Sequence, residues 1–189
     1  MNKIEWFCQI LCKRSAEHAE AMSRINDLPG IMVSILRQEL DSMVRAIYLL
    51  SVNDIHERER LITQTLNGEE WAIVASNGKR KKITDREMVD LSENLHGWTL
   101  SVYKFGCAFI HFSNFHDYSE TNPFEALNAE EKADILKHLR HYHGGPQTDN
   151  PSFQELSTYF PSVLEKITGN LSFYVEDIKS NKIYSLAEL

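Results

Sequence analysis

Apolar positions in the middle of the chain recur with the spacing of one face of an α-helix. They follow one another at steps of three and four residues: Met88, Leu91, Leu95, Trp98, Val102, Phe105, Phe109 and Phe112. Thr84 and Glu87 stand just before them in the capping-box arrangement that begins a helix. We therefore predict that residues 85–112 form the longest helix, with its apolar edge mostly buried. Gly97 and Gly106 weaken this helix but need not break it.

The same kind of periodicity predicts helices elsewhere in the chain. The expected helices span residues 3–26, 31–51, 54–66, 128–143, 152–159 and, after Pro161, a last segment to about residue 179. Residues 71–75 and 81–83, joined by a turn at 76–79, have the pattern of two short strands. The predicted fold class is all-α, an antiparallel helical bundle with a small β-hairpin near 71–83, as a single domain over residues 1–189. Residues 180–189 give no clear pattern.

Composition and charge narrow the classes of protein. The chain has 189 residues, 42% of them hydrophobic, and a formal net charge of −7. This charge argues against non-specific binding of nucleic acid or membrane over the whole surface, although a local basic cleft is compatible with it. The one dense basic run is Lys79–Lys82, which suits either a solvated hairpin tip or a contact to a phosphate backbone.

The N-terminus and the cysteines bear on the compartment. The N-terminal residues lack the pattern of a signal peptide, and no apolar run approaches 18 residues. The three cysteines are an odd number without metal-site spacing, which is typical of reduced thiols. We expect a cytoplasmic protein that makes no use of a membrane.

Two polar residues on the predicted central helix form the first candidate site. Lys104 and His111 are seven residues apart, which on a helix is two turns, or about 10 Å, along nearly the same face. Cys107 and Ala108 between them are small, so another helix or a ligand could approach. We predict that Lys104 and His111 face a shared polar groove at a two-fold dimer interface. The alternative is that Lys104 extends to solvent and His111 bonds a neighbouring backbone group.

These residues also carry a resemblance to a known family. The stretch Tyr103–His111, set after a helix that contains Leu36–Asp41 and Tyr48–Leu50, resembles the HEPN superfamily, and more narrowly an uncharacterised bacterial branch of it. The resemblance covers roughly residues 30–118. It implies an α-helical bundle that is commonly dimeric. Many HEPN domains are metal-independent ribonucleases of toxin–antitoxin, phage-defence or CRISPR systems.

The HEPN signature is an Arg, four to six residues and then a His, with a polar residue usually following the Arg. His111 matches the His, Lys104 stands at the Arg position, and Phe105 replaces the polar neighbour. The resemblance implies His111 as general acid or base for attack by a ribose 2′-hydroxyl, with Lys104 stabilising the phosphorane. Because Lys lacks the planar fork of Arg, we favour a catalytically silent or weakly active module for RNA or nucleotide binding or regulation. The endoribonuclease is the alternative.

Further polar residues complete the candidate set. The predicted binding residues are Ser113, Asn114, His116, Asp117, Arg140 and His143. Arg140 and His143 equally suit the end of a helix, where cations complement the dipole. On the helix over 31–51, Arg37 and Asp41 lie at i and i+4 and can pair.

A metal-dependent hydrolase is the second alternative. The side chains that could serve it are His111, His116 and Asp117 with His138, His141 or His143. The His116–Asp117 pair also resembles HD-type phosphohydrolases, for which His96 and Asp134 or Asp149 would have to supply the remaining ligands. We nevertheless expect no tightly bound metal and no cofactor. The expected partners are a second copy of the chain, RNA or a nucleotide, and an antitoxin-like protein.

Overall fold

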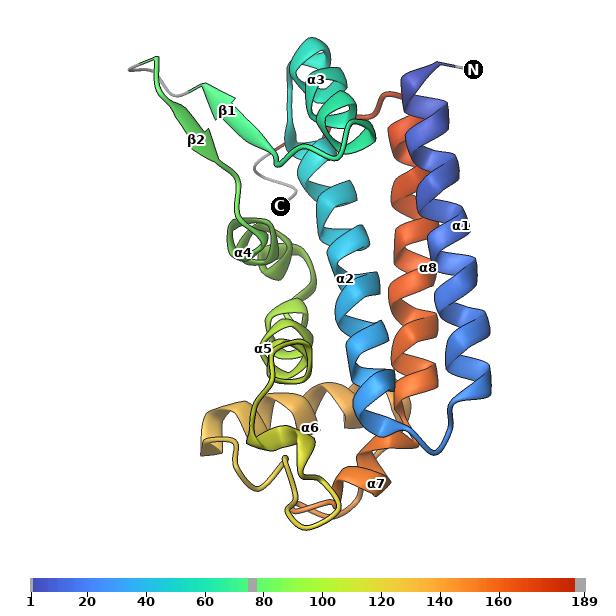
Figure 1. Cartoon of the computed structure of the whole chain (residues 1–189), viewed down its shortest axis with the longest axis vertical. Helices are drawn as coiled ribbons and strands as arrows, with labels where there is room; N and C mark the ends of the chain where they lie inside the picture. The colour runs from blue at the N-terminus through green and yellow to red at the C-terminus, as the bar shows by residue number, and fades with distance from the viewer. Residues whose placement is uncertain (1, 75–77, 186–189) are drawn as a thin grey trace.

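The computed structural model describes residues 2–74 and 78–185. Its helices are α1 (Lys3–Arg24), α2 (Pro29–Ser51), α3 (Ile55–Leu66), α4 (Asp85–His96), α5 (Thr99–Ile110), the 3₁₀ turn η1 (Asn114–His116), α6 (Ala129–His143), α7 (Phe153–Ser157) and α8 (Phe160–Lys179). Within the described residues the one sheet pairs β1 (Ala72–Val74) with β2 (Arg80–Lys82). The predicted all-α bundle with a small hairpin is confirmed (Figure 1).

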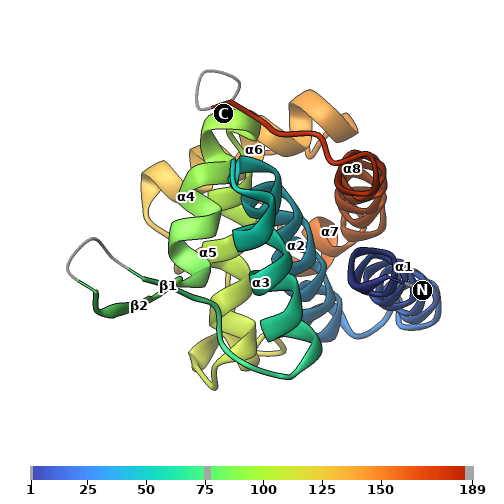
Figure 2. The same ribbon diagram turned by 90° about the horizontal axis from the view of Figure 1, so that it is seen from above.

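Helix α2 is the centre of the bundle. It packs against α8 and α1 on one side and against α5 and α4 on the other, as the view from above makes clear (Figure 2). Its side chains are buried around most of its circumference, including Leu40, Met43, Ile47 and Leu50. A helix that is apolar on nearly all sides has to lie inside a protein, and this composition explains the position of α2.

The prediction of one helix over residues 85–112 is wrong. Gly97 separates α4 from α5, with φ 68°, and its N–H bonds the Glu93 carbonyl. An αL residue ends a helix, and glycine adopts this conformation without a Cβ penalty. The Glu93 carboxylate then accepts from the Thr99 hydroxyl at 2.7 Å and the Leu100 N–H at 2.8 Å, which caps the start of α5. The longest helix is α2, with 23 residues.

The predicted apolar edge is buried only in part. Met88, Trp98 and Phe109 are buried, whereas Phe112 is 97% exposed. Helix α5 ends at Ile110, and the next residue is extended with ψ 139°. Phe112 therefore lies beyond the helix whose face it was expected to continue.

The hairpin joins the bundle at its base. Ala72 pairs with Lys82 and Val74 with Arg80, and the Ile83 N–H donates to the Trp71 carbonyl. Trp71 and Ile83 are buried, so the hairpin is anchored there while its strands extend outward (Figures 1 and 2). Residues 76 and 77 of the predicted turn at 76–79 lie outside the described residues.

The remaining helices agree with the sequence pattern to within a few residues. The capping box predicted at Thr84 is present at the start of α4, and the Asn128 side chain accepts from the Glu131 N–H at the start of α6. The N–H of Tyr184 donates to the carbonyl of Leu50, so the end of the described chain returns to α2. No helix in the described ranges is both long enough and apolar enough to cross a membrane.

Candidate functional site

Lys104 of the predicted pair has a carboxylate partner within the chain. Its ammonium nitrogen lies 3.6 Å from a carboxylate oxygen of Glu131 on α6. The two side chains line a small hollow of about 40 Å³ together with Glu93, Asp134 and neighbouring apolar residues. This hollow is therefore lined by more carboxylates than cations.

His111 occupies a different place. It is the exposed residue that follows the last turn of α5, and its N–H bonds the Cys107 carbonyl. It is not part of the lining of the hollow beside Lys104. A groove shared by Lys104 and His111 across a dimer stays a prediction.

The polar segment after α5 is organised by local contacts. The Ser113 hydroxyl donates to the Ala108 carbonyl at 2.7 Å and accepts from the Phe115 N–H, which caps η1. The imidazole of His116 lies 3.2 Å from the Phe109 carbonyl and stacks on the ring of Phe112. Two further predicted binding residues, Asn114 and Asp117, are exposed.

Arg140 and His143 lie in the last turn of α6 and have different surroundings. Arg140 donates to the Pro146 carbonyl at 2.8 Å and pairs with Asp149 at 2.8 Å, so it holds the following loop. His143 instead faces an apolar pocket beside α8, where burial, followed by the charge of Lys166, lowers the pKa of its imidazole.

The ligands considered for a metal are dispersed. Among residues 2–74 and 78–185, no three His, Cys, Asp or Glu side chains come together as metal ligands would. His96 is engaged elsewhere, with its Nε2 2.7 Å from the Tyr174 hydroxyl. The metal-dependent alternative thus draws no support from the arrangement of these side chains.

The structure does bring together a group that the sequence alone did not indicate. A cavity of about 520 Å³, which we call the polar cleft, lies between α1, α2, the loop after α3 and the start of α4. Its charged lining residues are Arg14, Asp41, Arg45, Glu69, Glu70, Lys82 and Asp85. Its apolar lining includes Phe7, Ile10, Leu11, Leu66, Trp71 and Ile83.

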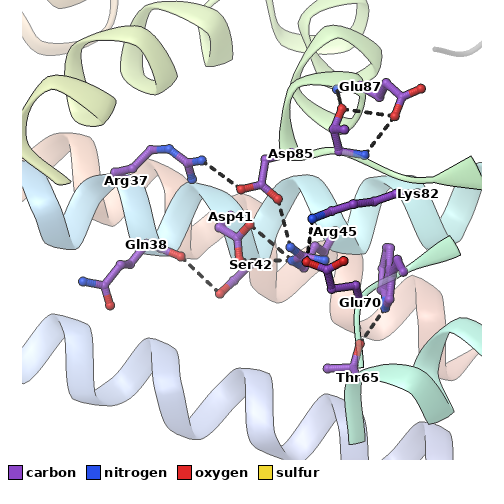
Figure 3. A network of polar contacts seen from close by, with 12 residues as sticks. Arg37, Gln38, Asp41, Ser42, Arg45, Thr65, Glu70, Lys82, Asp85 and Glu87 are labelled. Carbon is purple, nitrogen blue, oxygen red and sulfur yellow. Dashed lines mark hydrogen bonds and ion pairs between the residues drawn. The ribbon is translucent and has the colours of Figure 1, made fainter. Parts of the chain in front are cut away.

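Arg45 is the centre of the polar cleft (Figure 3). Its Nε donates to both carboxylate oxygens of Asp41, at 3.2 and 3.1 Å, and its Nη2 donates to Asp85 at 3.0 Å. The guanidinium carbon also lies 5.1 Å from the centroid of the Trp71 ring, whose indole N–H bonds Thr65 at 2.7 Å. Arg45 therefore connects α2, α4 and the base of the hairpin.

Asp85 is shared by a second arginine. Arg37, one turn further from Arg45 than Asp41, donates to Asp85 at 3.3 Å. The predicted pair on α2 is thus replaced: Asp41 binds Arg45, and Arg37 turns to α4. Because Asp85 is the first residue of α4, its carboxylate also interacts favourably with the helix dipole.

The other two cations of the polar cleft are held more loosely. The nearest atoms of Arg14 and Asp41 are 3.9 Å apart, beyond hydrogen-bond distance, and the Arg14 side chain is 38% exposed. Lys82 pairs with Glu70 at 2.5 Å, but both side chains are more than half exposed, at 57% and 73%. Exposed pairs of this kind contribute about 0–1 kcal/mol, so a ligand can replace their carboxylates.

Comparison with known proteins adds no family assignment. No protein-family model, no curated protein and no solved structure matches this chain.

Proposed function

We propose that this chain is a non-catalytic binding module for a nucleoside phosphate, either free or at the end of an RNA strand, in the polar cleft. The observation that carries the proposal is the convergence of Arg14, Arg45 and Lys82, from three different elements, on one cavity of about 520 Å³. Pockets for small ligands and cofactors commonly enclose about 300–1,000 Å³.

The three cations have separate roles in this proposal. Arg45 is fixed in place by Asp41 and Asp85, which offset its charge, so it supplies positioned N–H donors. Arg14 and Lys82 exchange their exposed contacts to Asp41 and Glu70 for charge-assisted hydrogen bonds to the phosphate oxygens. Inorganic phosphate alone should bind poorly, because the neighbouring carboxylates repel it.

The carboxylates of the polar cleft favour a nucleotide over a bare anion. Ribose hydroxyls and base amino groups are hydrogen-bond donors, and Glu69 and Glu70 are exposed acceptors at the same cavity. Ile10 and Ile83 supply apolar surface for a base. A nucleotide carries both the anion and the donors that such a mixed lining can satisfy.

The residues suggested by the HEPN resemblance favour binding over catalysis. Lys104 faces Glu131, whose negative charge offsets the positive charge that a phosphorane would require. His111 is exposed, so a macromolecule can reach it, and this accessibility is the observation in favour of the endoribonuclease alternative. Cleavage of RNA by the wild type that is lost in His111→Ala with an unchanged melting curve would establish that alternative.

The dimer and the antitoxin-like partner belong to the same proposal. Ile110 and Phe112 are exposed large apolar residues next to His111, where a second copy or a partner protein would have to contact the chain. Sedimentation velocity of wild type and Phe112→Ser tests this: a dimer that the substitution dissociates supports the contact, and a monomeric wild type removes it.

The proposed function is tested by equilibrium binding. Fluorescence anisotropy of a labelled single-stranded RNA is measured with wild type and with Arg14→Gln/Lys82→Gln, and adenosine 5′-monophosphate and inorganic phosphate serve as competitors. The matched control is Arg24→Gln/Lys179→Gln, which removes two paired cations that do not line the polar cleft. We expect the cleft variant to bind at least about tenfold more weakly, or about 1.4 kcal/mol, and the control to match wild type.

Two results would contradict this function. The first is a wild type that binds neither the RNA nor the nucleotide. The second is an equal loss of affinity in the cleft variant and the control, which would mean that binding follows net charge and not the polar cleft.

A further inference from the structure

A second cavity lies on the other side of α2, between α5, α6 and α8. It encloses about 80 Å³ and is almost entirely apolar, and we call it the apolar pocket. Its principal apolar lining residues are Leu36, Trp98, Val102, Phe105, Leu139 and Val163. The polar members of the lining are Ser101, His138, Tyr142, His143 and Lys166. A cavity of this volume holds about three groups the size of a water molecule, at roughly 30 Å³ each.

Lys166 is a cation in an aromatic setting. Its ammonium nitrogen lies 3.5 Å from the centroid of the Tyr142 ring and 5.7 Å from that of Trp98. Among the described residues, no Asp or Glu oxygen lies within the 4 Å of an ion pair with Lys166. Burial lowers the pKa of its ammonium group.

The charge of Lys166 also acts on two neighbouring histidines. Burial, followed by the Lys166 charge, lowers the pKa of His143 and lowers the pKa of His96 to about 4. Both imidazoles are therefore neutral near pH 7. A neutral imidazole at the rim, such as that of His143, can donate one hydrogen bond to an anion.

We propose that the apolar pocket binds a small monocarboxylate with a short aliphatic tail, with the carboxylate at Lys166 and the tail among Val102, Leu139 and Val163. An unpaired ammonium group at an apolar cavity matches a ligand that has one negative charge and an apolar end. The same ammonium group repels an amine of equal size. The volume limits the buried tail to about three carbon groups.

This site is independent of the polar cleft and of the proposed function there. Lys166 lies on α8 and lines the apolar pocket, whereas the three cations of the polar cleft line the other cavity. The central helix α2 lies between the two cavities. A nucleotide should not compete with the small carboxylate, and the loss of one activity leaves the other in place.

The test is isothermal titration calorimetry with butyrate, hexanoate and butylamine. We expect butyrate to bind the wild type with a Kd of roughly a millimolar, as suits so few heavy atoms. Butylamine should not bind, and hexanoate should bind no better than butyrate because its longer tail exceeds the cavity. Lys166→Met should weaken butyrate binding by at least about tenfold, whereas Lys137→Met, an exposed lysine on α6, should not change it.

A second variant separates the cavity from the charge. Ser101→Phe places a ring into the apolar pocket while retaining Lys166, and it should also abolish butyrate binding if the tail enters there. Circular dichroism confirms that each variant is folded. The proposal is overturned if the wild type binds no butyrate at about 10 mM, or if butylamine binds as well as butyrate. It is equally overturned if folded Lys166→Met retains full affinity.

Discussion

Gly106 determines how closely α5 approaches α2, and its replacement by alanine should destabilise the bundle. A Cβ at position 106 would lie 2.6 Å from the Cβ of Arg37, 3.1 Å from its Cγ and 3.2 Å from its Cδ. Arg37 cannot easily move, because it is buried, lies 4.4 Å from the centroid of the Tyr103 ring and bonds Asp85. The nearest atom is a Cβ, which follows the backbone of α2.

Two opposing effects determine the magnitude. Replacing glycine by alanine inside a helix gains about 1 kcal/mol in propensity. Overpacking a well-packed interface costs about 1–3 kcal/mol, and a clash with a Cβ belongs at the upper end of that range. We therefore expect Gly106→Ala to lower the free energy of unfolding by about 1–2 kcal/mol in net terms.

Gly169 on α8 is the matched control. It has a helical backbone, and a Cβ built there meets no atom within 4 Å. Gly169→Ala should raise the free energy of unfolding by up to about 1 kcal/mol through propensity alone. Urea unfolding followed by far-UV circular dichroism measures both variants. A Gly106→Ala variant that is as stable as Gly169→Ala would refute the close approach of α5 to α2.

Two further predictions concern the side of the bundle around Trp98. Trp98→Ala should destabilise by about 3–5 kcal/mol, because the ring is only 4% exposed; a loss under about 1 kcal/mol in a urea melt would contradict its packing. Burial, followed by the charge of Lys166, lowers the pKa of His96 in the folded chain to about 4. Because the unfolded chain keeps the ordinary histidine pKa of about 6.5, it binds a proton at His96 first, and the free energy of unfolding should fall as the pH falls from about 6.5 to about 4. His96→Gln should flatten part of that fall in pH-dependent urea melts, and an unchanged profile would contradict the neutral imidazole.

The fold class could be predicted because it follows from local spacing. The capping box at Thr84 and the apolar face of α2 are both signals within a few residues of the chain. The break at Gly97 could not be predicted from the same information. The apolar spacing across it continues unchanged, and only the packed structure shows that this glycine has a positive φ.

The polar cleft could not be predicted for a different reason. Arg14, Arg45, Trp71, Lys82 and Asp85 are far apart in the sequence and meet only when α1, α2, the hairpin and α4 assemble. The one local signal was the spacing of the charged residues on α2, which indicated polar contacts on a largely apolar helix. It led to the wrong partners, because Asp85 could not be placed beside α2 from sequence.

The pair Lys104 and His111 shows why helical spacing alone could not place these two side chains. Seven residues place two side chains on one face only while the helix continues, and α5 ends at Ile110. The partner of Lys104 is Glu131 of α6, which is 27 residues away in the sequence and could not be placed beside α5 from local spacing.

The most direct test of the central proposal is to locate the ligand on the protein by NMR. Adenosine 5′-monophosphate is added to labelled protein, and the side-chain N–H signals of Arg14, Arg45 and Trp71 are followed beside those of His111. The proposed function predicts saturable shifts of the three polar-cleft signals and an unchanged His111. Shifts confined to His111 and its neighbours, or no shifts at any of these residues, would contradict it.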